Sequence, residues 1–243
     1  MSGSRILEVA ELDLHLAPYD WPFAAERADE IEAHWEERSK AQPSLFNGRI
    51  LLMSRHAFET RADGKIVLRG AYFETDFAAF LAWRDFGFPG AEVCNGFSMA
   101  ALQSTDGAFL LGEMAAHTAN AGAIYFAAGT PDPQDVFGDR VDLLASLTRE
   151  LEEETGIAAR ETTYGAGWIV VDAPPRIACI KIMQLGVPAA TAKARIEEFL
   201  ARDPRAELAA VHIVRSVDDA VPARTLDFVR DFLSYALAQR SVG

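Results

Sequence analysis

The sequence has few of the features that mark several common protein classes. It contains two cysteines in 243 residues, Cys94 and Cys179, far apart and in apolar surroundings. This pattern is typical of buried thiols in a reducing compartment rather than of a disulfide framework. None of the five histidines stands at metal-ligand spacing from another, which argues against a zinc site. We therefore expect a cytoplasmic protein with neither disulfide nor zinc.

Long apolar runs and basic clusters are also missing. No uninterrupted apolar stretch approaches the roughly 20 residues of a membrane helix. Residues 1–20 contain no basic leader and no long apolar stretch, so we expect no secretory signal. The net charge of −13 repels nucleic-acid backbone. We expect neither a membrane nor a nucleic-acid partner. A phosphate-bearing small molecule would need local neutralisation, which a bound divalent cation can provide.

The remaining composition is that of a globular protein. Hydrophobic residues make up 50% and charged residues 24% of the chain, as in ordinary soluble domains. The length allows one large domain or two small ones. The glycines and proline of residues 86–90 place a boundary there. We expect an N-terminal extension over 1–90 and a main domain over 91–243. Packing against the main domain and homodimerisation both stay open as roles for the extension.

Helical and strand patterns are mixed without strict alternation, which predicts an α+β fold with a mixed sheet. Asp20 followed by Pro22 is typical of a helix start. Helices are predicted over residues 20–41, 75–85, 140–155, 191–202 and 225–240. Strands are predicted over residues 5–16, 49–59, 65–73, 97–103, 108–114, 121–128, 168–172, 177–187 and 208–214.

The helix predicted over 140–155 has an unusual charge pattern. Its leucines at 144, 147 and 151 form a core-facing stripe, and Gly156 is placed to end it in a left-handed cap. Glu150, Glu153 and Glu154 are spaced i, i+3 and i+4, so they share an adjacent stripe. Each exposed carboxylate near a helix C-terminus is disfavoured by about 0.3–1 kcal/mol. A hard divalent cation would relieve this repulsion; an acidic, solvated helix end is the alternative.

Residues 149–157, RELEEETGI, resemble the second half of the Nudix box, GX5EX7REUXEEXGU, in which U is a bulky aliphatic residue. Every fixed position from Arg149 onward is met. By this resemblance the chain is identified as a member of the Nudix hydrolase superfamily. The resemblance implies an α/β/α sandwich with a mixed sheet over 91–243, preceded by the α/β extension. It also implies Mg²⁺- or Mn²⁺-dependent cleavage of a pyrophosphate bond in a small nucleotide substrate.

The first half of the box departs from the family pattern. Counted back without gaps, the box glycine falls on Asp135 and the first glutamate on Val141. If Gly129 takes the part of the glycine, the loop carries about six extra residues. Asp139 or Asp142 would then stand in for the missing glutamate. The partner of the box arginine is left open by this departure.

A weaker likeness extends over more of the chain. Short segments at residues 43–48, 72–77, 105–106 and 129–133 are similar to the Nudix subgroup that hydrolyses UDP-glucose and UDP-galactose. This likeness implies a UDP-sugar substrate. ADP-ribose, a dinucleotide, coenzyme A and a nucleoside triphosphate stay open as alternatives. So do a catalytically silent nucleotide sensor, favoured by the missing first glutamate, and a purely structural α+β domain.

The resemblance also assigns roles to residues. Glu150, Glu153 and Glu154 would be the metal ligands, which suits the preference of Mg²⁺ for oxygen. Arg149 would orient the glutamates. The general base would be Glu150, Glu154 or Glu207, the last of which is otherwise an ordinary surface glutamate. Substrate contacts are predicted for Gly129 and Arg176, with a solvated loop arginine as the alternative for Arg176. Base stacking or core packing is expected for Tyr125 and Phe126.

Overall fold

A mixed β-sheet runs through the chain. The computed structural model describes residues 4–90 and 92–240. Residues 1–3, 91 and 241–243, which belong to the predicted segments 1–90 and 91–243, lie outside the described part. The main path of the sheet is β13-β5-β4-β12-β11-β1-β3-β2. Its strands are β1 (Arg5–Leu16), β2 (Arg49–Thr60), β3 (Ile66–Asp76), β4 (Asn95–Gln103), β5 (Phe109–Met114), β11 (Trp168–Ala173), β12 (Arg176–Leu185) and β13 (Leu208–Val214).

Two of the strand pairs along this path are parallel, β1 with β3 and β12 with β4. The other neighbours are antiparallel. The predicted α+β class with a mixed sheet is therefore confirmed. The domain boundary near residue 90 stays a prediction. In the sheet, β1 of the predicted N-terminal extension lies between β3 of the same segment and β11 of the predicted main domain.

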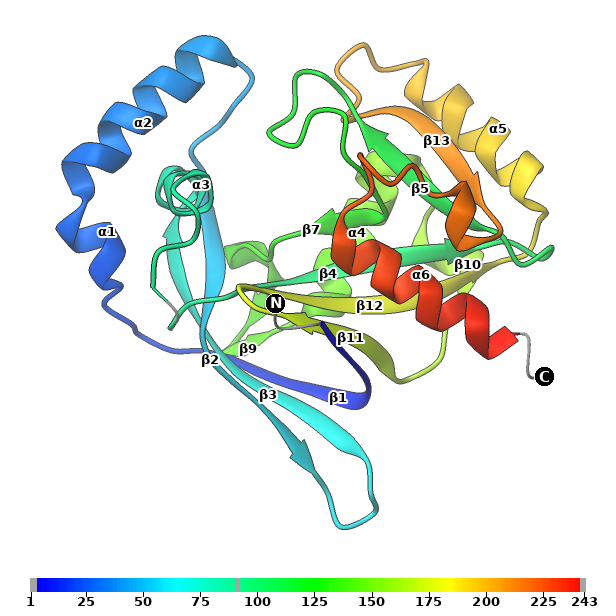
Figure 1. Cartoon of the computed structure of the whole chain (residues 1–243), viewed down its shortest axis with the longest axis horizontal. Coiled ribbons are helices and arrows are strands. Elements are labelled where there is room, and N and C mark those ends of the chain that lie inside the picture. Colours follow the sequence, from blue (N-terminus) through cyan, green and yellow to red (C-terminus); the bar gives the residue numbers. More distant parts are fainter. Residues whose placement is uncertain (1–3, 91, 241–243) are drawn as a thin grey trace.

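Six helices of the described residues pack around this sheet. They are α1 (Pro22–Glu26), α2 (Ala28–Ala41), α3 (Phe77–Asp85), α4 (Leu143–Thr155), α5 (Ala189–Leu200) and α6 (Asp227–Arg240). Figure 1 shows α6 in front of the sheet, α4 behind it, and α1 to α3 at one end. No helix in the described part of the chain has the length and apolar character needed to cross a membrane.

Alternation along β4 shows how the sheet separates two cores. Ala100 and Leu102 pack in one core with side chains of α4 and α5. Met99 and Ala101 pack in the other with side chains of α6. Successive side chains of a strand point to opposite faces, so the central strands are covered on both sides, as in an α/β/α sandwich. A third core lies between α1, α2, α3 and the strands β2 and β3.

The helix predicted over 20–41 is wrong in two respects. It is divided at Arg27 into α1 and α2, and Asp20 does not cap it. The N-cap residue is instead Trp21, directly before Pro22, and it has no side-chain cap bond. The buried Trp21 ring contacts Phe73 and Trp83, and this packing fixes the start of the helix where a polar cap was expected.

The strand predicted over 121–128 is also wrong in extent. It is divided into β6 (Ile124–Tyr125), which pairs with β5, and β7 (Ala127–Gly129), which pairs with β4. The chain changes partner at Phe126, whose buried ring packs against Phe109 and Phe232. Phe126 is thus a core residue, the second of its two expected roles. The remaining short strands are β8 (Val136–Phe137), β9 (Arg140–Val141) and β10 (Thr162–Thr163).

Candidate active site

Helix α4 has well-defined ends. The Asp142 carboxylate accepts hydrogen bonds from the N–H groups of Leu144 and Ala145, at 2.9 and 3.0 Å. Gly156 ends the helix with φ of 69°, which confirms the predicted left-handed cap. The helix starts later than predicted, because residues 140–141 form β9 and Asp142 is the capping residue. Since its carboxylate is used in this cap, Asp142 does not replace the missing box glutamate.

The three glutamates of α4 have different surroundings. Glu154 is 5% exposed, and its Oε2 atom has no hydrogen-bond partner. The Glu150 side chain is 19% exposed, whereas that of Glu153 is 63% exposed. At 100° per residue, Glu154 lies about 40° from Glu150 on one side and Glu153 about 60° on the other. The fold therefore buries Glu154, partly buries Glu150 and leaves Glu153 towards solvent; the role of Glu153 as a ligand stays a prediction.

A cavity of about 1360 Å³ brings five of the predicted site residues together. Its lining includes Glu150 and Glu154 from α4, Gly129 from β7, Glu207, which directly precedes β13, and Arg176 from the start of β12. These residues come from four separate parts of the sequence. Of the residues predicted for the site, Arg149 and Glu153 do not line this cavity.

Gly129 lies against Glu150. A Cβ atom added at Gly129 would lie 2.5 Å from both Cγ and Oε1 of Glu150. No side chain fits in this space without moving the glutamate, so glycine at this position allows β7 and α4 to approach closely. The geometry supports the assignment of Gly129 to the site.

Burial makes the two inner glutamates hard to ionise. Desolvation raises the pKa of Glu150 to about 7, against the opposing effect of Arg149. Desolvation also raises the pKa of Glu154 well above its usual range, and the charges of Glu150 and Glu207 add to this effect. Two carboxyl groups that share a desolvated site hold protons in this way unless a cation is close.

Arg149 is held by carboxylates on both sides. Its Nη1 donates to Glu150 Oε1 at 2.9 Å, and its Nη2 donates to Asp135 Oδ2, also at 2.9 Å. Asp132 Oδ2 lies 3.3 Å from the same Nη2. Arg149 thus pairs directly with the Glu150 carboxylate; its role in orienting the glutamates stays a prediction.

Asp135 is the partner of Arg149 that the sequence did not identify. Its side chain is 3% exposed, and burial raises its pKa. Asp139, expected as one stand-in for the missing box glutamate, is 77% exposed and interacts with His15. The spacing of Asp132 and Asp135 in the sequence was the signal that could have indicated this partner. The two residues close a turn in which the Asp132 N–H donates to Asp135 Oδ2 at 3.0 Å.

The donor chemistry of this cavity suits a hard divalent cation. Within residues 4–90 and 92–240, no three His, Cys, Asp or Glu side chains converge closely enough, as they stand, to form a metal site. However, Glu154 Oε2 is buried without a partner, and the Glu150 and Glu207 carboxylates border the same cavity. Mg²⁺ keeps several waters and binds through one or two carboxylates. Glu150 and Glu154 therefore supply the kind of oxygen donors that such an ion takes.

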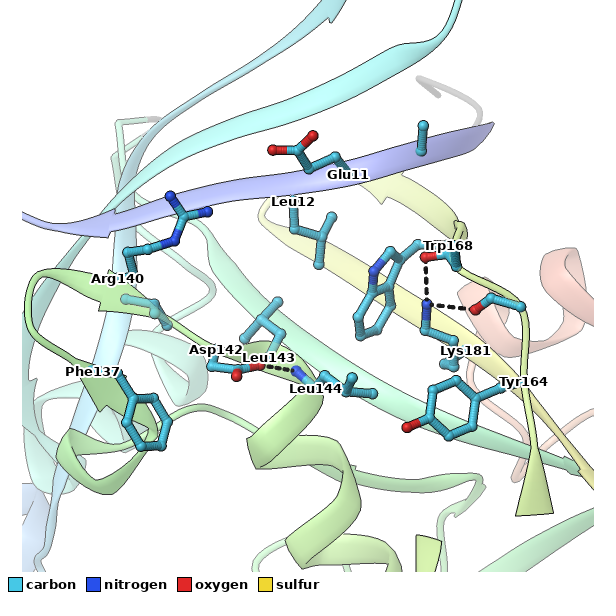
Figure 2. A pocket seen from close by; sticks show the side chains of 14 residues that line it. Glu11, Leu12, Phe137, Arg140, Asp142, Leu143, Leu144, Tyr164, Trp168 and Lys181 are labelled. Atoms are coloured by element: carbon cyan, nitrogen blue, oxygen red, sulfur yellow. Dashed lines mark hydrogen bonds between the residues drawn. The ribbon is translucent and has the colours of Figure 1, made fainter. Parts of the chain in front are cut away.

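A second cavity of about 450 Å³ lies elsewhere and contains a different buried charge (Figure 2). Lys181 Nζ donates to the carbonyls of Gly165, Ala166 and Gly167 at 3.3, 3.0 and 2.7 Å. It also lies 4.0 Å from the centroid of the Trp168 ring. All three N–H donors of this ammonium group are used, so Lys181 fastens the loop of residues 165–167 and is not available to a ligand.

Comparison with known proteins finds matches among solved structures only. No protein-family model and no curated protein matches the chain. A Nudix hydrolase from M. smegmatis, RenU, matches with 15% identity and a TM-score of 0.39, over 61% of this chain and 84% of that chain. The chain is similar to Nudix hydrolases.

Two further structures match to a similar degree. A C. elegans Ap4A hydrolase has 15% identity and a TM-score of 0.40, over 60% of this chain and 96% of that chain. A MutT protein from Methanosarcina mazei Go1 has 20% identity and a TM-score of 0.38, over 60% and 94%. At these TM-scores the matches assign no substrate, and we therefore base the proposed function on the residues of this chain.

Proposed function

We propose that this chain is a Nudix-type hydrolase that depends on Mg²⁺ or Mn²⁺ and splits the pyrophosphate bond of a nucleoside diphosphate joined to another group. The observation that carries this proposal is the pair of inner glutamates, Glu150 and Glu154, which line a large cavity. The Oε2 atom of the buried Glu154 has no hydrogen-bond partner, whereas buried polar atoms are normally satisfied, and a cation with substrate phosphates would supply the missing partner.

Each residue of the site has a separate task in this proposal. Glu150 and Glu154 hold the ion, with Glu153 as a further ligand once its side chain turns inwards. Arg149 keeps the Glu150 carboxylate in place through their 2.9 Å hydrogen bond. When bound, the ion makes a water more acidic and stabilises charge on the phosphoryl oxygens.

The proton of the attacking water needs an acceptor. Glu150 is one candidate, because its side chain lines the cavity and is oriented by Arg149. Glu154 and Glu207 are the other carboxylates of the cavity that could accept the proton.

The substrate class rests on the cavity and on the short sequence segments given above. A volume of about 1360 Å³ accommodates a complete nucleotide derivative, because drug-sized ligands occupy roughly 300–1,000 Å³. Tyr125 borders the cavity and is 8% exposed, so its ring edge can contact a base or a sugar. We propose a UDP-sugar as the substrate, in a cytoplasmic enzyme.

A substrate panel with Mg²⁺, read by analysis of the phosphate-containing products, tests this function. The panel contains UDP-sugars, ADP-ribose, a dinucleoside polyphosphate, coenzyme A and nucleoside triphosphates. We expect hydrolysis of a nucleoside diphosphate derivative, lost in the double variant E150Q/E154Q. The matched control E152Q/E198Q removes two exposed glutamates outside the cavity and should retain activity. Wild-type turnover by E150Q/E154Q would refute the site, and binding without turnover would indicate a nucleotide sensor.

A further inference from the structure

Two arginines line the cavity but have no part in the glutamate site. Arg176 begins β12, and Arg84 lies in the last turn of α3. In Figure 1, α3 and α4 are well separated, yet side chains from both border the same cavity. Arg84 belongs to the segment before residue 90, so this segment contributes directly to the cavity wall.

The Arg176 guanidinium has an aromatic neighbour and a cationic one. Its Cζ atom lies 4.7 Å from the centroid of the Phe88 ring. No carboxylate of the described residues forms a salt bridge with it, and its pKa is lowered by burial and by the charge of Arg84. Arg84 is paired with Asp85, whereas Arg176 forms no salt bridge within the described residues, so a bound anion would stabilise the charge of Arg176.

The backbone beneath Arg176 is strained. Phe88 has φ of 59°, a left-handed conformation that costs a residue other than glycine about 1–3 kcal/mol. Trp83 holds it there, since the Phe88 N–H donates to Trp83 O at 2.8 Å and the two rings meet edge to face at 4.8 Å. Strain of this kind is concentrated at ligand-binding sites. Here it presents the ring on which Arg176 stacks.

Arg84 is fixed in orientation but retains free donors. Its Nε donates to Asp85 Oδ1 at 3.0 Å and its Nη1 donates to Asn120 Oδ1 at 2.9 Å. Asn120 in turn donates to the hydroxyl of Tyr125 at 3.2 Å. A guanidinium group has five N–H donors, so these bonds position Arg84 and leave donors for a ligand in the cavity.

The register of the sheet separates the arginines from the glutamates. Arg176 pairs with Asn95 on β4, whereas Gly129, which touches Glu150, pairs with Ser98 on the same strand. Three residues along a strand span about 10 Å, roughly the length of a sugar joined to a phosphate. We propose that Arg84 and Arg176 together bind an anionic group, phosphoryl or carboxylate, carried by the part of the substrate that is joined to the nucleoside diphosphate, remote from the pyrophosphate at the glutamates.

The anion site itself does not depend on catalysis; only the identification of its ligand as part of the substrate rests on the proposed function. Guanidinium groups bind phosphate through paired, charge-assisted hydrogen bonds, and stacking on an aromatic ring is a feature of arginine rather than lysine. Arg176→Lys should therefore weaken the site even though it keeps the charge.

Inorganic phosphate is the probe for this site, added to metal-free protein while the melting temperature is measured. We expect phosphate to raise the melting temperature of the wild type by mass action. The apparent phosphate Kd should be weaker by about tenfold or more in R84Q/R176Q, and weaker to a smaller degree in R176K, which guards against a folding defect. The control R195Q/R230Q removes two exposed arginines that pair with acids elsewhere and should behave as wild type. Equal shifts in all four proteins would overturn the proposal.

A second pair of measurements separates this proposal from the proposed function. Phosphate should still bind to E150Q/E154Q; if it is lost there and retained in R84Q/R176Q, the phosphate site is at the glutamates and the proposal is wrong. If the wild type hydrolyses no compound of the panel but binds phosphate through the arginines, the proposed function fails and the anion site stands. With an active substrate, R176K should raise KM more than it lowers kcat.

Discussion

Glu154 and Lys181 are both buried charged residues, but their hydrogen-bonding needs are met to different degrees. Lys181 gives its three donors to three backbone carbonyls and lies over the Trp168 ring. Glu154 has an oxygen without a partner and a second glutamate nearby that raises its pKa. A satisfied buried charge stabilises the fold, whereas an unsatisfied one indicates a missing ligand. The two residues therefore predict opposite responses to substitution.

The largest expected effect is on catalysis at the unsatisfied charge. Glu154→Gln should lower kcat/KM with Mg²⁺ by at least ~100-fold, because a ligand of the ion is lost. Without metal its free energy of unfolding should be unchanged or higher, since an amide is cheaper to bury than an unpartnered carboxylate. Activity assays and urea unfolding measure the two quantities. A variant that is fully active, or clearly less stable than wild type, would contradict the comparison.

The next effect is on stability at the satisfied charge. Lys181→Met should lower the free energy of unfolding by about 1–3 kcal/mol, because the exposed loop of residues 165–167 loses its three hydrogen bonds to the ammonium group. The rate of hydrolysis per folded molecule should stay at the wild-type value, since Lys181 lies outside the large cavity. Urea unfolding with a parallel activity assay provides the measurement. If Lys181→Met left the free energy of unfolding unchanged, the contacts of Lys181 with residues 165–167 would not stabilise the fold.

A smaller effect is expected where the glutamate meets β7. Gly129→Ala places a Cβ atom 2.5 Å from Glu150 Cγ, so Glu150 must move and activity should fall roughly tenfold, with about 1–3 kcal/mol of stability lost to overpacking. Gly186→Ala is the matched control, because a Cβ atom there meets nothing within 4 Å. If both variants lost the same activity and stability, the close approach of β7 and α4 at Gly129 would not be the cause.

The smallest effect is on the pH dependence of metal-free stability. The folded pKa of Glu150 is raised from 4.5 to about 7, so between these values the folded state binds a proton that the unfolded state has released. The free energy of unfolding should therefore fall as pH rises through this window and stay lowered above it. Melting temperatures at several pH values measure this slope.

One variant and one added metal ion test whether Glu150 causes this pH dependence. Glu150→Gln should reduce the slope between pH 4.5 and 7 and leave the part that comes from Glu154, whose pKa burial also raises. Saturating Mg²⁺ should reduce it in the wild type, because metal binding favours the ionised carboxylate. A variant that keeps the wild-type slope would assign the titration to another group.

Local sequence rules predicted the parts of this protein that local interactions stabilise. The 3.6-residue period of the leucines gave the buried stripe of α4, and Gly156 gave its end, with φ of 69°. Strand alternation gave β1 with both ends correct, Arg5–Leu16. Errors arose where packing overrides local preference, as at Trp21, where aromatic contacts set the start of a helix in place of the capping residue expected at Asp20.

The sequence by itself determined that acidic side chains would gather at the end of α4, because helical spacing alone places them on neighbouring stripes. Only the tertiary structure decided that Glu154 is buried and Glu150 partly buried while Glu153 is exposed. It also decided that Asp135 is the partner of Arg149. Local patterns cannot specify these contacts, since each depends on a loop or a strand that packing brings against the helix from elsewhere in the chain.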